Sequence, residues 1–204
     1  AAQLFEKTGS SVDWIVRRKF LRCSAVRVFG GEKLTCYCVL YERCCLYEIT
    51  VLHYFLNFSG QTVLFCSPDG KPVRTMEGFT IKADAPLSAI EPENARCLIL
   101  PGGPAKAVDT PEWRALLQAL RDQGALLLAI CAGVDVLDRA GVLDGLRSTH
   151  SCEADWVFDK NVLTARANAY VDFAIEGAKA LQLFRDEEDL RETVDFWKNR
   201  KRMQ

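Results

Sequence analysis

The sequence predicts an α/β fold: a three-layer α/β/α sandwich with a mainly parallel central sheet. From Thr35 onward, short apolar segments typical of buried strands alternate with longer segments whose apolar residues recur at helical spacing. The stretch 125–133, A-L-L-L-A-I-C-A-G, is an apolar run that leads into a turn of small residues, as a buried parallel strand does. Strands that alternate with helices form parallel sheets with both faces covered.

The first half of the domain begins with a strand over 36–41 (C-Y-C-V-L-Y) and a helix over 46–58. Apolar residues mark the buried face of that helix, and Gly60 ends it, because glycine commonly follows the last helical turn. A second strand is expected over 63–67. The segments 73–75 and 79–83 flank a Glu-Gly turn and are expected to form a hairpin.

The second half repeats the alternation. Residues 97–100 (C-L-I-L) form the next predicted strand, which ends in Pro101-Gly102-Gly103. Thr110 is suited to cap a helix that has Pro111 at its first position and runs to about Gln123. After the strand that leads to Cys131, helical spacing continues up to Gly141. The remaining predicted elements are a strand over 161–165 and helices over 170–181 and 186–202.

The length of 204 residues suits one domain with additional segments at its ends. We expect an N-terminal extension over 1–34, the α/β domain over 35–184, and a C-terminal helix within 185–204 that packs on the same domain. The extension is rich in arginine. A transit peptide is one interpretation, but Glu6 and Asp13 favour a segment packed on the domain or on a partner subunit.

Composition narrows the classes of partner. The net charge of -1 gives no electrostatic case for a nucleic acid or a membrane surface. The longest apolar runs are shorter than the ~20 residues that a membrane-spanning helix needs. The nine cysteines include no C-x-x-C pair, and with only two histidines a zinc cluster is not expected. The cysteines are interpreted as reduced thiols of a cytoplasmic protein, with no metal or cofactor predicted.

The candidate site lies at the carboxyl ends of the predicted strands, where parallel sheets bind ligands. Cys131 stands between a strand and a helix, the geometry of a nucleophile elbow, where the helix N-terminus favours a thiolate. Gly102 and Gly103 end a strand about one strand–helix–strand unit earlier, and their amides, with that of Ala132, are suited to an oxyanion hole. The alternatives are a buried structural cysteine and a plain glycine turn.

Two further side chains are candidates. Glu48 begins an otherwise apolar helix; burial would keep it protonated and able to donate to the thiolate or to relay protons. Alternatively, it stabilises the helix N-terminus. His150 follows the helix after Cys131 and is suited to activate the thiol or to move a proton to substrate. Its alternative is a surface histidine in a polar loop.

Five motifs occur in one order along the chain: L-Y-E-I-T, L-I-L-P-G-G, A-I-C-A-G, S-T-H, and V-L-T-A-R followed by D-F-A-I. Together they resemble the ThiJ/PfpI superfamily, which is flavodoxin-like and related to class I glutamine amidotransferases. The resemblance covers roughly 35–183. It implies that Cys131 is the elbow nucleophile, that Glu48 is its carboxylic partner, and that Gly103 and Ala132 supply oxyanion-hole amides. His150 looks like the histidine of the Parkinson-linked branch.

Departures from the pattern argue against some activities of the superfamily. The protease-like branch has histidine directly after the nucleophile, where this chain has Ala132, so peptidase activity is not expected. The isocyanide hydratase branch prefers Asp as the carboxylate and Thr directly after the cysteine, whereas this chain has Glu48 and Ala132 at these positions. Amidotransferases need a downstream His-x-Glu pair, which the spacing of His150 and Glu153 does not provide. The segment 166–169 replaces a glycine-rich turn that is common in relatives.

Three functions follow as hypotheses. The first is an enzyme on small reactive carbonyls, of the glyoxalase or repair type, which uses the Cys131 thiolate and Glu48 as general acid or base. The second is a redox or stress sensor, in which an oxidant modifies the same cysteine. The third is a ligand-binding domain without turnover. The expected partners are a small-molecule substrate or oxidant and, from the resemblance, a second copy in a homodimer.

Overall fold

The computed structural model describes residues 34–202, so that all but the last residue of the predicted N-terminal extension lies outside it. The helices and strands follow the predicted order. The main strands are β1 (Thr35–Val39), β2 (Thr62–Ser67), β5 (Ala85–Pro86), β6 (Ala95–Leu100), β7 (Leu126–Ile130), β8 (Trp156–Asp159) and β9 (Val162–Ala165). The α-helices are α2 (Tyr47–Phe58), α3 (Pro111–Asp122), α4 (Ala132–Arg139), α5 (Tyr170–Ala180) and α6 (Glu187–Trp197).

A seven-stranded sheet of order β5-β2-β1-β6-β7-β9-β8 forms the centre of the fold. Every neighbouring pair is parallel except β8 and β9, which are antiparallel. The predicted mainly parallel sheet is therefore confirmed. The strands β3 (Val73–Arg74) and β4 (Thr80–Ile81) form a separate antiparallel hairpin, as the sequence predicts. The edge strands β5 and β8 are additions to the predicted set.

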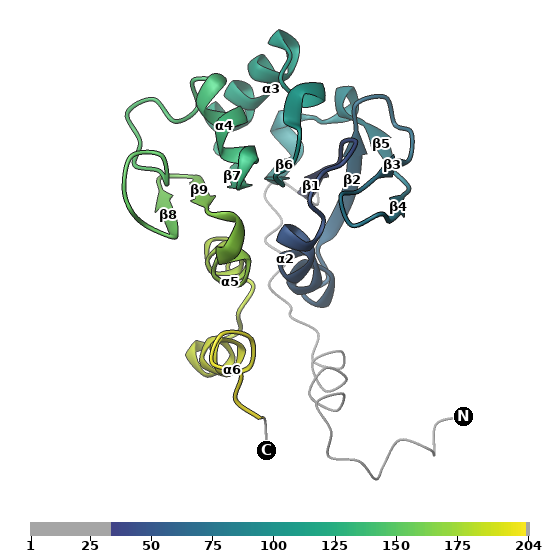
Figure 1. The fold of residues 1–204 in the computed structure, drawn as a ribbon. Helices are drawn as coiled ribbons and strands as arrows, with labels where there is room; N and C mark the ends of the chain where they lie inside the picture. Colours follow the sequence, from purple (N-terminus) through teal and green to yellow (C-terminus); the bar gives the residue numbers. More distant parts are fainter. Residues whose placement is uncertain (1–33, 203–204) are drawn as a thin grey trace, which may run out of the picture.

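Helices cover both faces of the sheet, as Figure 1 shows, with α3 and α4 on one side and α2 and α5 on the other. The alternation of side chains along each strand explains the two layers. In β1, Tyr37 and Val39 belong to the apolar cluster on the α3 and α4 side, whereas Cys36 and Cys38 belong to the cluster on the α2 and α5 side. The central strands β6, β7 and β9 are buried on both faces, which is why they are mostly apolar.

Helix α6 packs beside α2 and α5. The Trp197 ring lies 5.6 Å from the Tyr54 ring and 5.8 Å from the Phe55 ring, both in edge-on arrangements. Lys198 follows the helix and forms an ion pair with Asp172 of α5. The helix ends at Trp197, earlier than the predicted Arg202, because residues 198–202 are all polar or charged and offer no apolar side chain to bury a further turn.

Thiols are the unusual component of the core. The eight cysteines between Cys36 and Cys152 form no disulfide; most are buried, and the half-buried ones are Cys45, Cys131 and Cys152. Within residues 34–202 there is no group of three His, Cys, Asp or Glu side chains placed to hold a metal ion. In the same range, every helix is too short or too polar to cross a membrane.

Candidate functional site

The candidate site lies where two neighbouring strands end. β6 and β7 run parallel, with Leu100 opposite Ala129, so the residues that follow them meet at the carboxyl edge of the sheet. Gly102 follows β6 and Cys131 follows β7. The predicted juxtaposition of the Gly-Gly turn with the cysteine is therefore present.

Cys131 has the backbone geometry of an elbow. Its φ is 56° and its ψ is -132°, a combination that a residue with a side chain rarely adopts. Its N–H donates to the carbonyl of Ala165 at the end of β9, at 2.9 Å, and its carbonyl accepts from the N–H of Val134 at 3.0 Å. The sheet and the first turn of α4 together hold this strained conformation, which is the kind found at functional sites.

Glu48 is in the first turn of α2, and only 1% of its surface is exposed. Its Oε2 atom accepts a hydrogen bond of 2.6 Å from the backbone N–H of Gly102. Its Oε1 atom is buried and has no hydrogen-bond partner among the residues of the described chain. A buried carboxyl oxygen left without a donor is costly, so this oxygen is available for a proton or a substrate atom.

Gly102 lies where the cysteine and the carboxyl group meet. A Cβ atom at this position would lie 2.6 Å from Cβ and 2.8 Å from Sγ of Cys131, and also 2.8 Å from Oε2 of Glu48. These distances are shorter than van der Waals contact. Glycine is therefore required here for the thiol and the carboxyl group to approach each other across the end of β6.

Burial raises the pKa of both ionisable groups of this pair. For Glu48 the burial effect exceeds the opposing effect of the Gly102 hydrogen bond. For Cys131 burial is again the main cause, the negative charge of Glu48 adds to it, and the N–H of Ala132 only partly offsets them. The direction for Glu48 agrees with the expectation from the sequence. The direction for Cys131 is opposite to the effect expected from a helix N-terminus alone.

His150 is beside α4 and contacts two acidic residues of that helix. Its Nε2 atom lies 3.0 Å from Oδ1 of Asp135, and its Nδ1 atom lies 3.5 Å from Oδ2 of Asp138. No hydrogen bond joins His150 to Cys131 within residues 34–202. The negative charge of Asp135 is also a minor cause of the raised pKa of Cys131. Asp135 thus connects the two predicted residues electrostatically.

The predicted oxyanion-hole amides have separate environments. The N–H of Gly102 is donated to Glu48, so in this structure it positions the carboxyl group. Gly103 has a φ of 124°, and a Cβ atom there would lie 2.6 Å from the carbonyl oxygen of Arg43, so glycine permits the close approach of the loop after β1. Ala132 begins α4 beside the sulfur. An oxyanion role for Gly103 and Ala132 stays a prediction.

The loop after β1 contributes residues that sequence reasoning did not select. Tyr41 donates from its hydroxyl to the carbonyl of Pro101 at 2.7 Å, and the N–H of Cys45 donates to the carbonyl of Gly102 at 2.9 Å. The charges of Glu48 and Cys131 contribute to raising the pKa of Cys45 to about 11, after burial. The sequence signal that could have pointed to Cys45 is its position three residues before Glu48.

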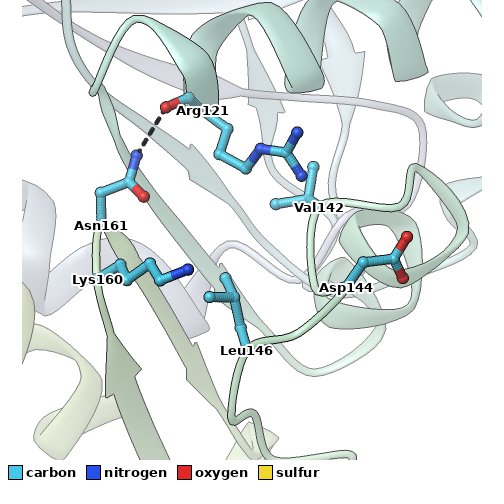
Figure 2. Close-up of a pocket in the computed structure, with 6 residues that line it drawn as sticks. All are labelled: Arg121, Val142, Asp144, Leu146, Lys160 and Asn161. Atoms are coloured by element: carbon cyan, nitrogen blue, oxygen red, sulfur yellow. Dashed lines mark hydrogen bonds between the residues drawn. The ribbon is translucent and has the colours of Figure 1, made fainter.

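A cavity of about 310 Å³ lies at the other edge of the sheet and is shown in Figure 2. Asn161 precedes β9 there, and its side-chain amide donates to the carbonyl of Arg121 at 3.1 Å. The cavity is lined by Arg121, Val142, Asp144, Leu146, Lys160 and Asn161. Since Cys131 follows the carboxyl end of β7, this cavity is separate from the cysteine site.

Comparison with solved structures supports the fold. A DJ-1 superfamily protein from Agrobacterium tumefaciens is 25% identical, with a TM-score of 0.72 over 82% of this chain and 100% of that one. An oxidized form of DJ-1 from Toxoplasma gondii is 23% identical, with a TM-score of 0.68 over 80% of this chain and 97% of that one. The similarity to the Toxoplasma gondii protein, at 23% identity, concerns the fold alone.

Comparison with curated sequences gives partial matches. A glutathione-independent glyoxalase, DJR-1.2 of Caenorhabditis elegans, is 32% identical over 47% of this chain and 53% of its own length. A deglycase from Pyrococcus horikoshii is 26% identical over 50% of this chain and 63% of its own length. The chain thus spans between half and two thirds of the length of these relatives.

The model of the DJ-1/PfpI family matches residues 35–180, which is most of the chain. With the cysteine elbow and the buried glutamate in place, the chain belongs to the DJ-1/PfpI family.

Proposed function

We propose that this chain is a cysteine-dependent enzyme that acts on small reactive carbonyl compounds, by glyoxalase-type or repair chemistry. The observation that carries the proposal is the unpartnered Oε1 atom of Glu48, which belongs to a carboxyl group held against the Cys131 thiol through Gly102. A nucleophile beside a base that is itself held in place is the arrangement that covalent catalysis requires.

In the proposed reaction the Cys131 sulfur adds to an aldehyde carbon while Glu48 accepts the thiol proton. This mode of activation suits a thiol whose pKa is raised, because the base removes the proton during the attack. With an α-oxoaldehyde, Glu48 passes this proton on to the former aldehyde oxygen, and the product is a hemithioacetal. Glu48, again ionised, then carries a proton from the former aldehyde carbon to the neighbouring carbonyl carbon, while the hydroxyl proton of the hemithioacetal moves to the neighbouring oxygen. The result is a thioester of a hydroxy acid, and water releases the acid and the thiol.

His150 has a supporting role in this proposal. Its contacts with Asp135 and Asp138 place the imidazole beside the exposed side of α4, the helix that Cys131 begins. An imidazole at this position is suited to exchange protons with solvent when the thioester is hydrolysed. The names of the curated relatives, a glyoxalase and a deglycase, support carbonyl chemistry for the matched segments.

The test is conversion of methylglyoxal to lactate by the wild type and by Cys131→Ser. The matched control is Cys152→Ser, because Cys152 is also half-buried but donates to the carbonyl of Ser148, away from the Gly102 turn. We expect turnover by the wild type and the control and loss in Cys131→Ser. Equal turnover by all three proteins rules out this proposal.

A redox sensor is the second candidate, and the partial exposure of Cys131 favours it. Most other thiols of the described chain are buried in the core, whereas Cys131 is only half-buried, and its sulfur lies beside a carboxyl group that can stabilise an oxidised product. After mild peroxide treatment, mass spectrometry should find oxygen on Cys131 before the buried cysteines. Uniform oxidation of all cysteines rules out this role.

A further inference from the structure

A second half-buried thiol lies next to the candidate site. Cys45 is in the loop between β1 and α2, and it differs from its neighbour Cys44, which is fully buried. Neither the proposed carbonyl chemistry nor the core uses the Cys45 side chain. Cys45 is partly exposed, as Cys131 is, and stands three residues before Glu48.

Gly102 is the shared neighbour of the two half-buried thiols. The N–H of Cys45 donates to the Gly102 carbonyl at 2.9 Å. On the other side of the same glycine, a Cβ atom built at residue 102 would lie 2.8 Å from the Cys131 sulfur. Because glycine has no Cβ atom, the sulfur can lie close to the backbone of residue 102. The negative charge of Cys131 also contributes to the raised pKa of Cys45, after burial and the charge of Glu48.

Hydrogen bonds connect the loop that carries Cys45 both to the turn at Pro101-Gly102 and to the segment of the β3–β4 hairpin. Tyr41 bonds to the Pro101 carbonyl, Cys44 bonds through its carbonyl to the N–H of Met76, and the Arg43 N–H donates to the carbonyl of Arg74. Cys45 therefore adjoins the β3–β4 hairpin as well as Gly102. A disulfide needs Cα atoms about 4.4–6.8 Å apart, and any movement of the loop that brings the two sulfurs to this separation also involves the hairpin.

We propose that Cys45 is the resolving thiol for an oxidised Cys131, so that the site forms a reversible Cys45–Cys131 disulfide. This inference rests on the proposed reactivity of Cys131. It adds a second redox-active residue to the site and names the product that a peroxide leaves there.

The chemistry balances with a peroxide as the oxidant. The Cys131 sulfur attacks one oxygen of hydrogen peroxide, the O–O bond breaks, and the departing hydroxide takes the thiol proton to form water. The Cys45 sulfur then attacks the sulfur of the resulting sulfenic acid, the S–O bond breaks, and the departing hydroxide takes the Cys45 proton. Two thiols have lost two electrons, and one peroxide has become two waters.

The disulfide protects Cys131 from a second peroxide, because oxidation to the sulfinic acid is not reversed by thiols. A thiol reductant returns both residues to the starting state.

The experiment treats the full chain with an excess of hydrogen peroxide, blocks free thiols, and maps tryptic peptides without reduction. Cleavage places Cys45 in the peptide 44–74 and Cys131 in the peptide 122–139, and fragment ions distinguish Cys45 from Cys44 and Cys66. We expect a cross-link between Cys45 and Cys131 that dithiothreitol removes. Cys45→Ser should lose the cross-link and make the sulfinic acid the major form of Cys131, whereas Cys152→Ser should keep the cross-link.

Two results overturn the inference in different ways. Equal sulfinic acid at Cys131 in the wild type and Cys45→Ser, with no linked peptide, removes Cys45 from the chemistry and leaves a reactive Cys131 intact. No preferential oxidation of Cys131 in either protein removes the redox candidate and this inference with it. Circular dichroism of Cys45→Ser establishes that the variant is folded before either result is interpreted.

Discussion

The backbone N–H of Gly102 donates a 2.6 Å hydrogen bond to Oε2 of Glu48. This bond joins the end of β6 to the first turn of α2 and fixes one oxygen of a buried carboxyl group. The other oxygen is left without a donor in residues 34–202, next to the elbow that carries Cys131. One glycine thus determines how the acid faces the thiol.

Substitution of Gly102 with alanine should break this arrangement. The new Cβ atom would lie 2.6 Å from Cβ of Cys131 and 2.8 Å from Oε2 of Glu48, so the thiol and the carboxyl group must separate. Overpacking of this kind costs about 1–3 kcal/mol. We expect a lower free energy of unfolding in urea and loss of methylglyoxal turnover.

The matched control is Gly60→Ala. Gly60 has a φ of 67° and no atom within 4 Å of a built Cβ, so alanine there introduces backbone strain without a clash. This variant should lose stability and keep its turnover. If Gly102→Ala keeps wild-type turnover, the close approach of Glu48 and Cys131 is not required.

The strained backbone of Cys131 predicts that a residue suited to this conformation stabilises the fold, although the activity is lost with the thiol. A φ of 56° with a ψ of -132° is accessible to glycine but unfavourable for residues with a Cβ atom. Cys131→Gly should therefore be more stable than Cys131→Ala by about 1–2 kcal/mol, and both variants should be inactive. Urea unfolding of the two variants measures the difference. Equal stability would show that the elbow relaxes when the thiol is removed.

Glu48 should make stability depend on pH in a definite direction. Its pKa in the folded protein is raised above the ordinary value of 4.5. Such a group stabilises the fold at low pH, and this contribution is lost as the pH rises through the raised pKa. Glu48→Gln does not titrate. Its free energy of unfolding, relative to the wild type, should therefore increase as the pH rises above 4.5.

Urea unfolding at a series of pH values measures this difference. A difference between Glu48→Gln and the wild type that does not change with pH would mean that burial does not disfavour the charged form of Glu48.

The sheet and its main helices follow from the sequence because apolar periodicity and turn residues determine them locally. The apolar run before Cys131 and the glycines after Leu100 each signal a strand end, and parallel pairing brings such ends together. The helix after Thr110 begins as predicted, with the Thr110 hydroxyl accepting from the Trp113 N–H at 3.2 Å. Each of these signals is contained within a few residues.

The remaining features depend on contacts between segments. β5 has two residues, one of them Pro86, and joins the sheet only through β2, so no local pattern marks it. The acidic residues that contact His150 belong to α4, and the sequence alone does not determine against which side of that helix the His150 loop packs. Cys45 becomes notable only because its N–H meets Gly102, a contact across 57 positions of the chain.

The central claim is that Cys131 and Glu48 act as one unit that shares a proton. The pH dependence of Cys131 alkylation, followed by mass spectrometry of the peptide 122–139, tests it most directly in the wild type and in Glu48→Gln. We predict a wild-type midpoint above the ordinary thiol pKa of 9.0 and a lower midpoint in Glu48→Gln, because glutamine removes the negative charge beside the sulfur. The same midpoint in both proteins would contradict the claim.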